Sequence, residues 1–192
     1  MSYGSTAIVE SQPMGLGIFN NVSIKSIEAL TTEPKRETDK AYEVLDIVFQ
    51  NETDETYRLR LFNSDEDTDH VRVAKGQVRN SNTIAYVAGK IKGEETSLDG
   101  SKIKSWKDFT AAAIKLLGDY SGKAFQFKTV GNVWNGKAKL VLPVYWGWLE
   151  SMESSKKLAY SQSEKEANAE YESFFANRGG SGALAEDDDT PF

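Results

Sequence analysis

The sequence predicts a β-dominated domain of five strands, with a helical insertion between the third strand and the fourth. Three observations support this fold class. Apolar and polar residues alternate in three stretches before residue 64, as expected for strands with one buried face. An apolar stripe with helical spacing lies at residues 105–118. Further on, Asn135-Gly136 is a strong hairpin signal, because a type I′ turn needs positive φ at both central residues.

The first predicted strand covers residues 15–30 and follows a flexible N-terminal segment at residues 1–13. Successive side chains of a strand point to opposite faces of the sheet. Ile18, Val22 and Ile24 would therefore share one face. Phe19 and Lys25 would lie on the other face.

Two more strands follow, at residues 41–51 and 56–63, separated by a polar turn. The third strand alternates cleanly. Its core face would carry Tyr57, Leu59 and Leu61, and its outer face would carry Arg58, Arg60 and Phe62.

The helical insertion begins with an acidic loop and a weakly helical stretch that has Ile84, Val87 and Ile91 on one stripe. The helix at residues 105–118 is the clearest in the chain. Ser105 and Asp108 have capping-box spacing at its start, with Asp in place of Glu or Gln.

The closing hairpin is predicted to run through residues 122–148, with its turn at Asn135-Gly136. This register places Lys128 opposite Pro143 and Phe127 opposite Val144. One face of the hairpin is apolar and is predicted to join the core: Phe125, Phe127, Val133, Leu140, Leu142, Val144 and Trp146. The other face combines cations with aromatic rings: Lys128, Trp134, Lys137, Lys139 and Tyr145.

The hydrophobic periodicity fades after Glu150. Residues 151–176 suit a helical extension, and residues 177–192 read as a disordered Gly-Ser linker and acidic tail. Three strands, a helical insertion and a closing hairpin are the element order of an OB-fold, a five-stranded barrel. We therefore expect an OB-fold domain at residues 14–150.

An OB-fold binds single strands with the outer face of strands two and three and with its loops. Such binding needs cations near the phosphates and aromatic faces on which bases stack. The third strand and the hairpin each offer both kinds of side chain, and the first strand could extend the track. The predicted nucleic-acid contacts are Arg58, Arg60, Phe62, Lys128, Trp134, Lys137, Lys139, Tyr145, Phe19 and Lys25. The alternative is that these cations only make an outer sheet face soluble, with Phe62 and Trp134 covered by a loop.

The charge distribution agrees with a nucleic-acid partner, although the whole chain has a net charge of −6. Residues 79–149 carry eleven basic and five acidic side chains, whereas residues 151–192 carry four basic and nine acidic ones. A basic middle and an acidic end form the kind of asymmetry that indicates nucleic-acid binding. An ordinary domain with a solubilising tail would show the same split.

The acidic end has a more specific pattern. Its last six residues are Asp187, Asp188, Asp189, Thr190, Pro191 and Phe192. They resemble the C-terminal peptide of bacterial single-stranded DNA-binding proteins, which ends Asp-Asp-Asp-x-Pro-Phe, with Thr190 where that family usually has an aliphatic residue. A basic partner pocket could accept the acids, and an apolar notch the Phe ring.

The resemblance implies that this peptide recruits replication, recombination and repair proteins and competes with DNA for the protein's own basic groove. Body and tail together look more like phage-encoded single-stranded DNA-binding proteins. Bacterial members form tetramers and phage members are often monomers or dimers, so a homo-oligomer stays open. We expect a cytoplasmic protein, in the host bacterium if it is phage-encoded.

The residues that several other functions would require are absent from the sequence. The chain has no Cys and one His, which excludes thiolate zinc sites and makes a His-based triad or multi-His metal site unexpected. No apolar run is long enough to span a membrane. We expect no cofactor and no catalysis. Two rival functions remain: a protein–protein adaptor with the same fold, and a small nuclease that holds two metals with the acidic run at residues 65–69 and Asp46.

Overall fold

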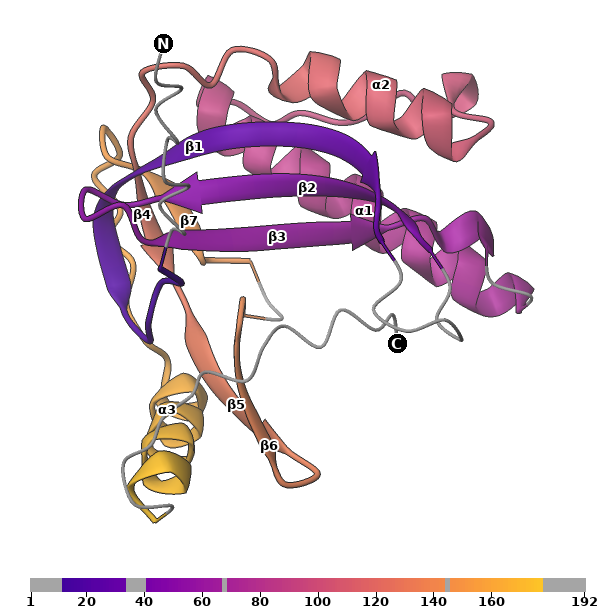
Figure 1. Cartoon of the computed structure of the whole chain (residues 1–192). Coiled ribbons are helices and arrows are strands. Elements are labelled where there is room, and N and C mark those ends of the chain that lie inside the picture. The colour runs from indigo at the N-terminus through magenta and orange to yellow at the C-terminus, as the bar shows by residue number, and fades with distance from the viewer. Residues whose placement is uncertain (1–11, 34–40, 67–68, 144–145, 178–192) are drawn as a thin grey trace, which may run out of the picture.

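The structure is a computed structural model that describes residues 12–33, 41–66, 69–143 and 146–177. These residues form a five-stranded antiparallel sheet, a separate two-stranded hairpin and three α-helices (Figure 1). The strands of the larger sheet are hydrogen-bonded in the order β3-β2-β1-β4-β7. The fold is thus mixed sheet and helix, and the prediction of a strand-dominated chain was wrong in this respect.

The three strands predicted before residue 64 are present, and they form an antiparallel meander. They are β1 (Ile18–Thr31), β2 (Glu43–Gln50) and β3 (Thr56–Phe62). The predicted alternation of β3 is confirmed, since Leu61 is buried in the core and Arg58 is exposed. The strands were predictable because each carries its own alternating pattern.

Strand β1 pairs with β4 near its start and with β2 over the rest of its length. Its pairing with β4 shifts register between Phe19 and Val22, where Asn21 has a φ of 54°. Because of this irregularity, Phe19 pairs with the buried Phe127 and packs against the core. The prediction that Phe19 lies on the outer face was therefore wrong.

Between β3 and β4 the chain forms two long helices, α1 (His70–Lys92) and α2 (Trp106–Leu117). Asp69 caps α1 by accepting hydrogen bonds from the backbone N–H groups of Val71 and Arg72, and the helix ends at Gly93 in a left-handed conformation. The predicted apolar stripe of α1 is buried against the sheet. Two short 3-10 turns, η1 (Ser64–Glu66) and η2 (Gly100–Lys102), flank α1 in sequence.

The predicted long hairpin is divided into two units. Its first part forms β4 (Phe125–Lys128), which pairs in the larger sheet with β7 (Leu149–Ser151), a strand just beyond the predicted hairpin. Its inner parts form β5 (Val130–Trp134) and β6 (Lys137–Val141), the two-stranded hairpin. Phe127 thus pairs with Leu149, and the predicted pairing with Val144 was wrong. The same division overturns the pairing of Lys128 with Pro143.

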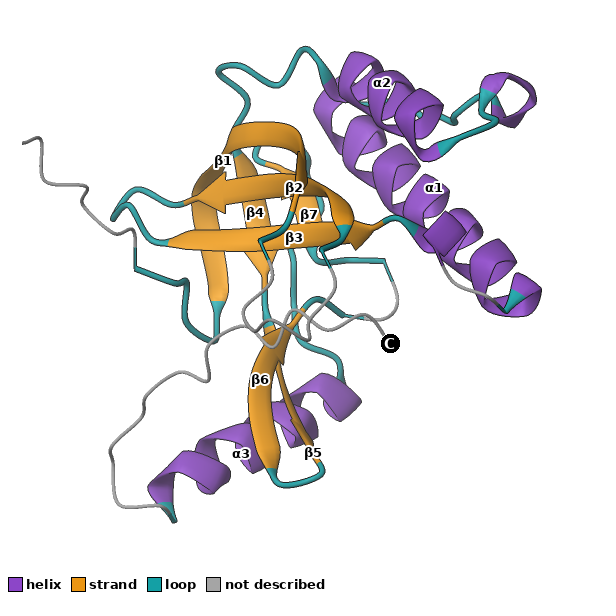
Figure 2. Ribbon diagram, turned by 45° about the vertical axis from the view of Figure 1, so that its right-hand side comes forward, coloured by secondary structure: helices purple, strands orange, loops and turns teal. Residues whose placement is uncertain are grey.

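The break comes at Thr129. Its backbone N–H donates to the carbonyl of Gly17, and its hydroxyl donates to the carbonyl of Gly15. Thr129 is fully buried, so these bonds satisfy its polar groups where the chain leaves the larger sheet. The β5–β6 hairpin therefore projects away from the sheet (Figure 2).

The last helix, α3 (Gln162–Ala176), packs on this projecting hairpin (Figure 2). A capping box between Ser161 and Glu164 starts the helix. The prediction of a helical extension at residues 151–176 is confirmed for its second half. The predicted disordered tail lies outside the described residues.

Candidate nucleic-acid interface

The β5–β6 hairpin turns at Asn135-Gly136, as predicted. Asn135 has a φ of 50° and Gly136 a φ of 72°, the two positive values that a type I′ turn requires. Trp134 pairs with Lys137 and Asn132 pairs with Lys139 across the hairpin. Residues directly opposite each other lie on the same face, so these four side chains form one surface, called the hairpin face below.

The hairpin face is open to solvent. Trp134 is 67% exposed, and Lys137 and Lys139 are exposed as well. A tryptophan of this exposure beside two cations is the local chemistry that single-strand binding requires. Three of the predicted nucleic-acid contacts are thus brought together on one surface.

Helix α3 covers the opposite face of the hairpin, which has small side chains at Gly131 and Ala138. The Asn168 side chain accepts a hydrogen bond of 2.9 Å from the Gly131 N–H. A Cβ at Gly131 would overlap the Cβ of Tyr171 and would lie 2.6 Å from its Cγ. Glycine at this position therefore allows the helix to approach the strand, and α3 supports the hairpin from behind.

Lys128 does not belong to the hairpin face. It is 5% exposed, and its ammonium group lies 2.9 Å from both carboxylate oxygens of Glu164 and donates to the Ala159 carbonyl. The Tyr160 ring adds a cation–π contact at 5.7 Å. The prediction that Lys128 faces a nucleic acid was wrong, because β4 belongs to the larger sheet and α3 covers its end.

On the outer face of β3, the positive charge is largely paired with a carboxylate. Arg60 makes a bidentate ion pair with the buried Asp46 on β2, with both distances at 2.8 Å. Arg58 lies 3.6 Å from the same carboxylate and keeps half of its side chain exposed. Phe62 packs edge-on against Tyr42. Only Arg58 of these predicted contacts is substantially open to solvent.

The remaining predicted residues are dispersed. Lys25 is exposed at a second irregularity of β1, between Ile24 and Ser26. Tyr145 and the predicted partner-binding residues 187–192 lie outside the described residues.

Trp146 was predicted to be a core residue, but it is 52% exposed. Its ring stacks on Tyr86 of α1, with centroids 4.9 Å apart and an interplanar angle of 26°. Trp148 takes the core position instead and is 2% exposed. The sequence contained a signal for this change, because Pro143 and Gly147 interrupt the strand pattern on either side of Trp146.

The Tyr86 ring is firmly held. Its hydroxyl donates to the Leu149 carbonyl at 2.7 Å and accepts from the N–H groups of Gly147 and Leu149 at 3.1 Å each. Burial raises the pKa of this hydroxyl, although the backbone hydrogen bonds with Leu149 and Gly147 act to lower the pKa. Tyr86 therefore stays neutral near pH 7 and gives Trp146 a fixed ring to stack on.

No protein-family model matches the chain, and no curated protein sequence matches it either. Within the described ranges, no cluster of three or more His, Asp or Glu side chains is arranged to hold a metal ion. In the same part of the chain, no helix combines the length with the apolar character of a membrane span.

Proposed function

We propose that this protein binds single-stranded DNA with little sequence preference and acts in replication or recombination. The hairpin face carries the proposal, because a tryptophan that is 67% exposed stands directly across from Lys137. Base stacking on an aromatic ring contributes about 1–3 kcal/mol per base and tolerates every base. The neighbouring lysines would pair with phosphates and release counterions.

The arrangement of the sheet supports an OB-fold, which is part of the proposal. A three-stranded meander, helices after its third strand and a final pair of strands follow the OB-fold order. In this reading the β5–β6 hairpin is the loop between strands four and five of the barrel. That loop is one of the two that bind oligonucleotides in OB-folds.

The sequence of the tail supplies the partner-binding part of the proposal. Asp187, Asp188 and Asp189 would bind a basic pocket of a replication or recombination protein, and Phe192 an apolar notch beside it. Pro191 limits the backbone freedom that is lost on docking.

The proposal is tested by titrating a fluorescent oligo-dT with the full-length protein at several salt concentrations. We expect tight binding at low salt that weakens steeply as salt rises, and weak binding of a duplex of equal length. Absence of single-strand binding at low salt, with or without residues 186–192, would contradict the proposal.

A second candidate is a protein–protein adaptor with the same fold. The Asp46 carboxylate favours an adaptor, because Asp46 neutralises much of the positive charge on the outer face of β2 and β3. An adaptor would leave oligo-dT unbound while still binding a replication protein through residues 187–192. The same titration separates the two candidates.

A further inference from the structure

Trp146 stands between two recesses of opposite charge. One recess, of about 790 Å³, lies between α1 and the segment that follows β6. The other, of about 910 Å³, lies between α1 and the segment around β7. Trp146 and Asn82 line both recesses.

The first recess is basic and partly apolar. Lys75, Val78 and Arg79 line it from α1, and Leu142 and Pro143 line it from the opposite side. Lys75 and Arg79 are exposed, and neither is ion-paired with a carboxylate among the residues that the structure describes. No Asp or Glu among these residues lines the recess. We call it the basic groove.

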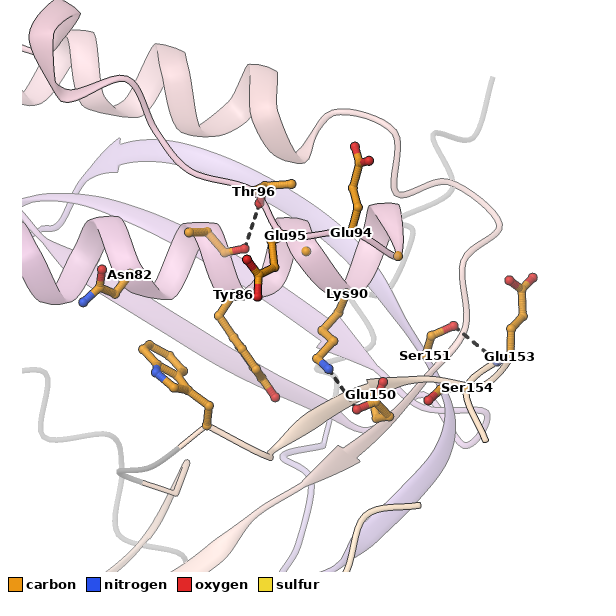
Figure 3. A pocket seen from close by; sticks show the side chains of 14 residues that line it. Asn82, Tyr86, Lys90, Glu94, Glu95, Thr96, Glu150, Ser151, Glu153 and Ser154 are labelled. Carbon is orange, nitrogen blue, oxygen red and sulfur yellow. Dashed lines mark hydrogen bonds and ion pairs between the residues drawn. The ribbon is translucent and has the colours of Figure 1, made fainter. Parts of the chain in front are cut away.

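The second recess is acidic. Glu94, Glu95 and Glu153 line it, together with the ion pair in which Lys90 lies 2.8 Å from Glu150 (Figure 3). Since Glu150 neutralises Lys90, three carboxylates remain. A chain of phosphates would be repelled from this side of Trp146 and attracted to the side of Lys75 and Arg79.

The basic groove also continues toward the hairpin. A third recess, of about 760 Å³, shares Leu142, Pro143 and Trp146 with it and reaches Asn132 on the hairpin face. The exposed Lys156 and Lys157 line this third recess, together with the exposed Glu170 and the Lys128–Glu164 ion pair. Among the described residues, its unpaired cations thus outnumber its one unpaired carboxylate. Cations and an exposed aromatic ring therefore follow one another from the hairpin to α1.

We infer that single-stranded DNA runs from the hairpin face across Leu142 and Pro143 into the basic groove. A base stacks on Trp146, and phosphates bind Lys75 and Arg79. This inference rests on the proposed function and assigns it a second contact region on α1. The acidic recess beyond Trp146 keeps the strand on the basic side.

The test compares full-length variants in binding to an oligo-dT of about 16 nucleotides, the upper end of the site size for one OB-fold. For single strands, the slope of log K against log salt is about 0.7 per phosphate contact. The double variant Lys75→Ala with Arg79→Ala should therefore bind more weakly and lose about 1.4 of that slope. Trp146→Ala should bind roughly five- to 150-fold more weakly with an unchanged slope, because stacking releases no counterion.

Two controls make the result specific. Lys107→Ala with Lys115→Ala removes two exposed cations of α2 and should leave affinity and slope unchanged. Trp146→Phe keeps an aromatic ring and should retain most of the affinity, which separates stacking from a folding defect. If wild type binds but the Lys75 and Arg79 variant keeps the wild-type slope, the inference fails and the proposed function stands. If wild type does not bind, both fail.

Discussion

The ammonium group of Lys128 and the carboxylate of Glu164 are bonded at 2.9 Å, although the two residues are 36 positions apart. Their side chains are 6% and 17% exposed. The pair joins the end of β4, in the larger sheet, to the first turn of α3. It thereby holds the helix that supports the hairpin face.

Glu164→Ala should destabilise the protein by about 3–5 kcal/mol, because it leaves the buried Lys128 charge without its counter-ion. Lys128→Met should cost less, since Glu164 is the more exposed partner and still accepts a hydrogen bond from the Ser161 N–H. The free energy of unfolding, from urea titrations, measures both. Oligo-dT binding by folded Lys128→Met should equal wild type, and a clear loss would restore Lys128 as a DNA contact.

The same pair should make stability depend on pH. Burial tends to raise the pKa of Glu164, but hydrogen bonds from the Ser161 N–H and Lys128 outweigh it, and the pKa is lowered. A carboxyl with a lowered folded-state pKa stabilises the protein above its unfolded pKa of about 4.3 and loses this effect as pH falls. The unfolding free energy of wild type should therefore fall more than that of Glu164→Gln between pH 6 and pH 3. Parallel curves would contradict the assignment.

Gly131→Ala should destabilise the protein by about 1–3 kcal/mol, because the added methyl group meets Tyr171 of α3. Gly15→Ala is a matched control, since a Cβ there would have no heavy atom of the described residues within 4 Å, apart from its own chain neighbours. Thermal melts of the two variants give the comparison. Equal melting temperatures would show that α3 can move away from β5 at little cost.

Trp134→Ala with Lys137→Ala should weaken oligo-dT binding at least tenfold, or about 1.4 kcal/mol. Both side chains lie on the hairpin face, away from α3, so the fold should be preserved. Fluorescence anisotropy measures the affinity, and circular dichroism checks the fold. Unchanged affinity would show that DNA binds elsewhere.

Deletion of residues 186–192 should tighten oligo-dT binding at low salt. The deletion removes four carboxylates, and these would otherwise compete with phosphates for the lysines. The gain should vanish at high salt, where exposed charges are screened. Weaker binding after the deletion would mean that the tail contributes to DNA binding directly.

Local patterns explain what the sequence could predict. The three strands before residue 64 alternate, α2 has a cap and an apolar stripe, and Asn135-Gly136 specifies its own turn. The hairpin face depends only on that turn and on the alternation beside it. Each signal is contained within a few residues, so tertiary contacts did not need to be known.

Long-range pairing explains what could not be predicted. Apolar alternation runs through residues 125–146, but β4 pairs with β1 and β7 rather than with the predicted partners at residues 143–146. In the alternating pattern, Lys128 occupies a position expected to be exposed. It is buried because Glu164 and α3 cover it. The alternation of the predicted hairpin placed Trp146 on the core face, but Trp148 occupies the core position after the chain turns at Gly147, whose φ is 130°.

The two-sided pairing of β1 has a consequence for the order of folding. The part of β1 from Ser23 onward pairs with β2, which follows within a few tens of residues. Gly17, just before β1, instead bonds with Thr129, and these two residues are 112 positions apart in the chain. During synthesis at about 5–20 residues per second, the start of β1 must wait several seconds for its partner. Contacts of such sequence separation also slow refolding. The meander should therefore form early, and docking of β4 with its partner β7 should be the step that completes the sheet.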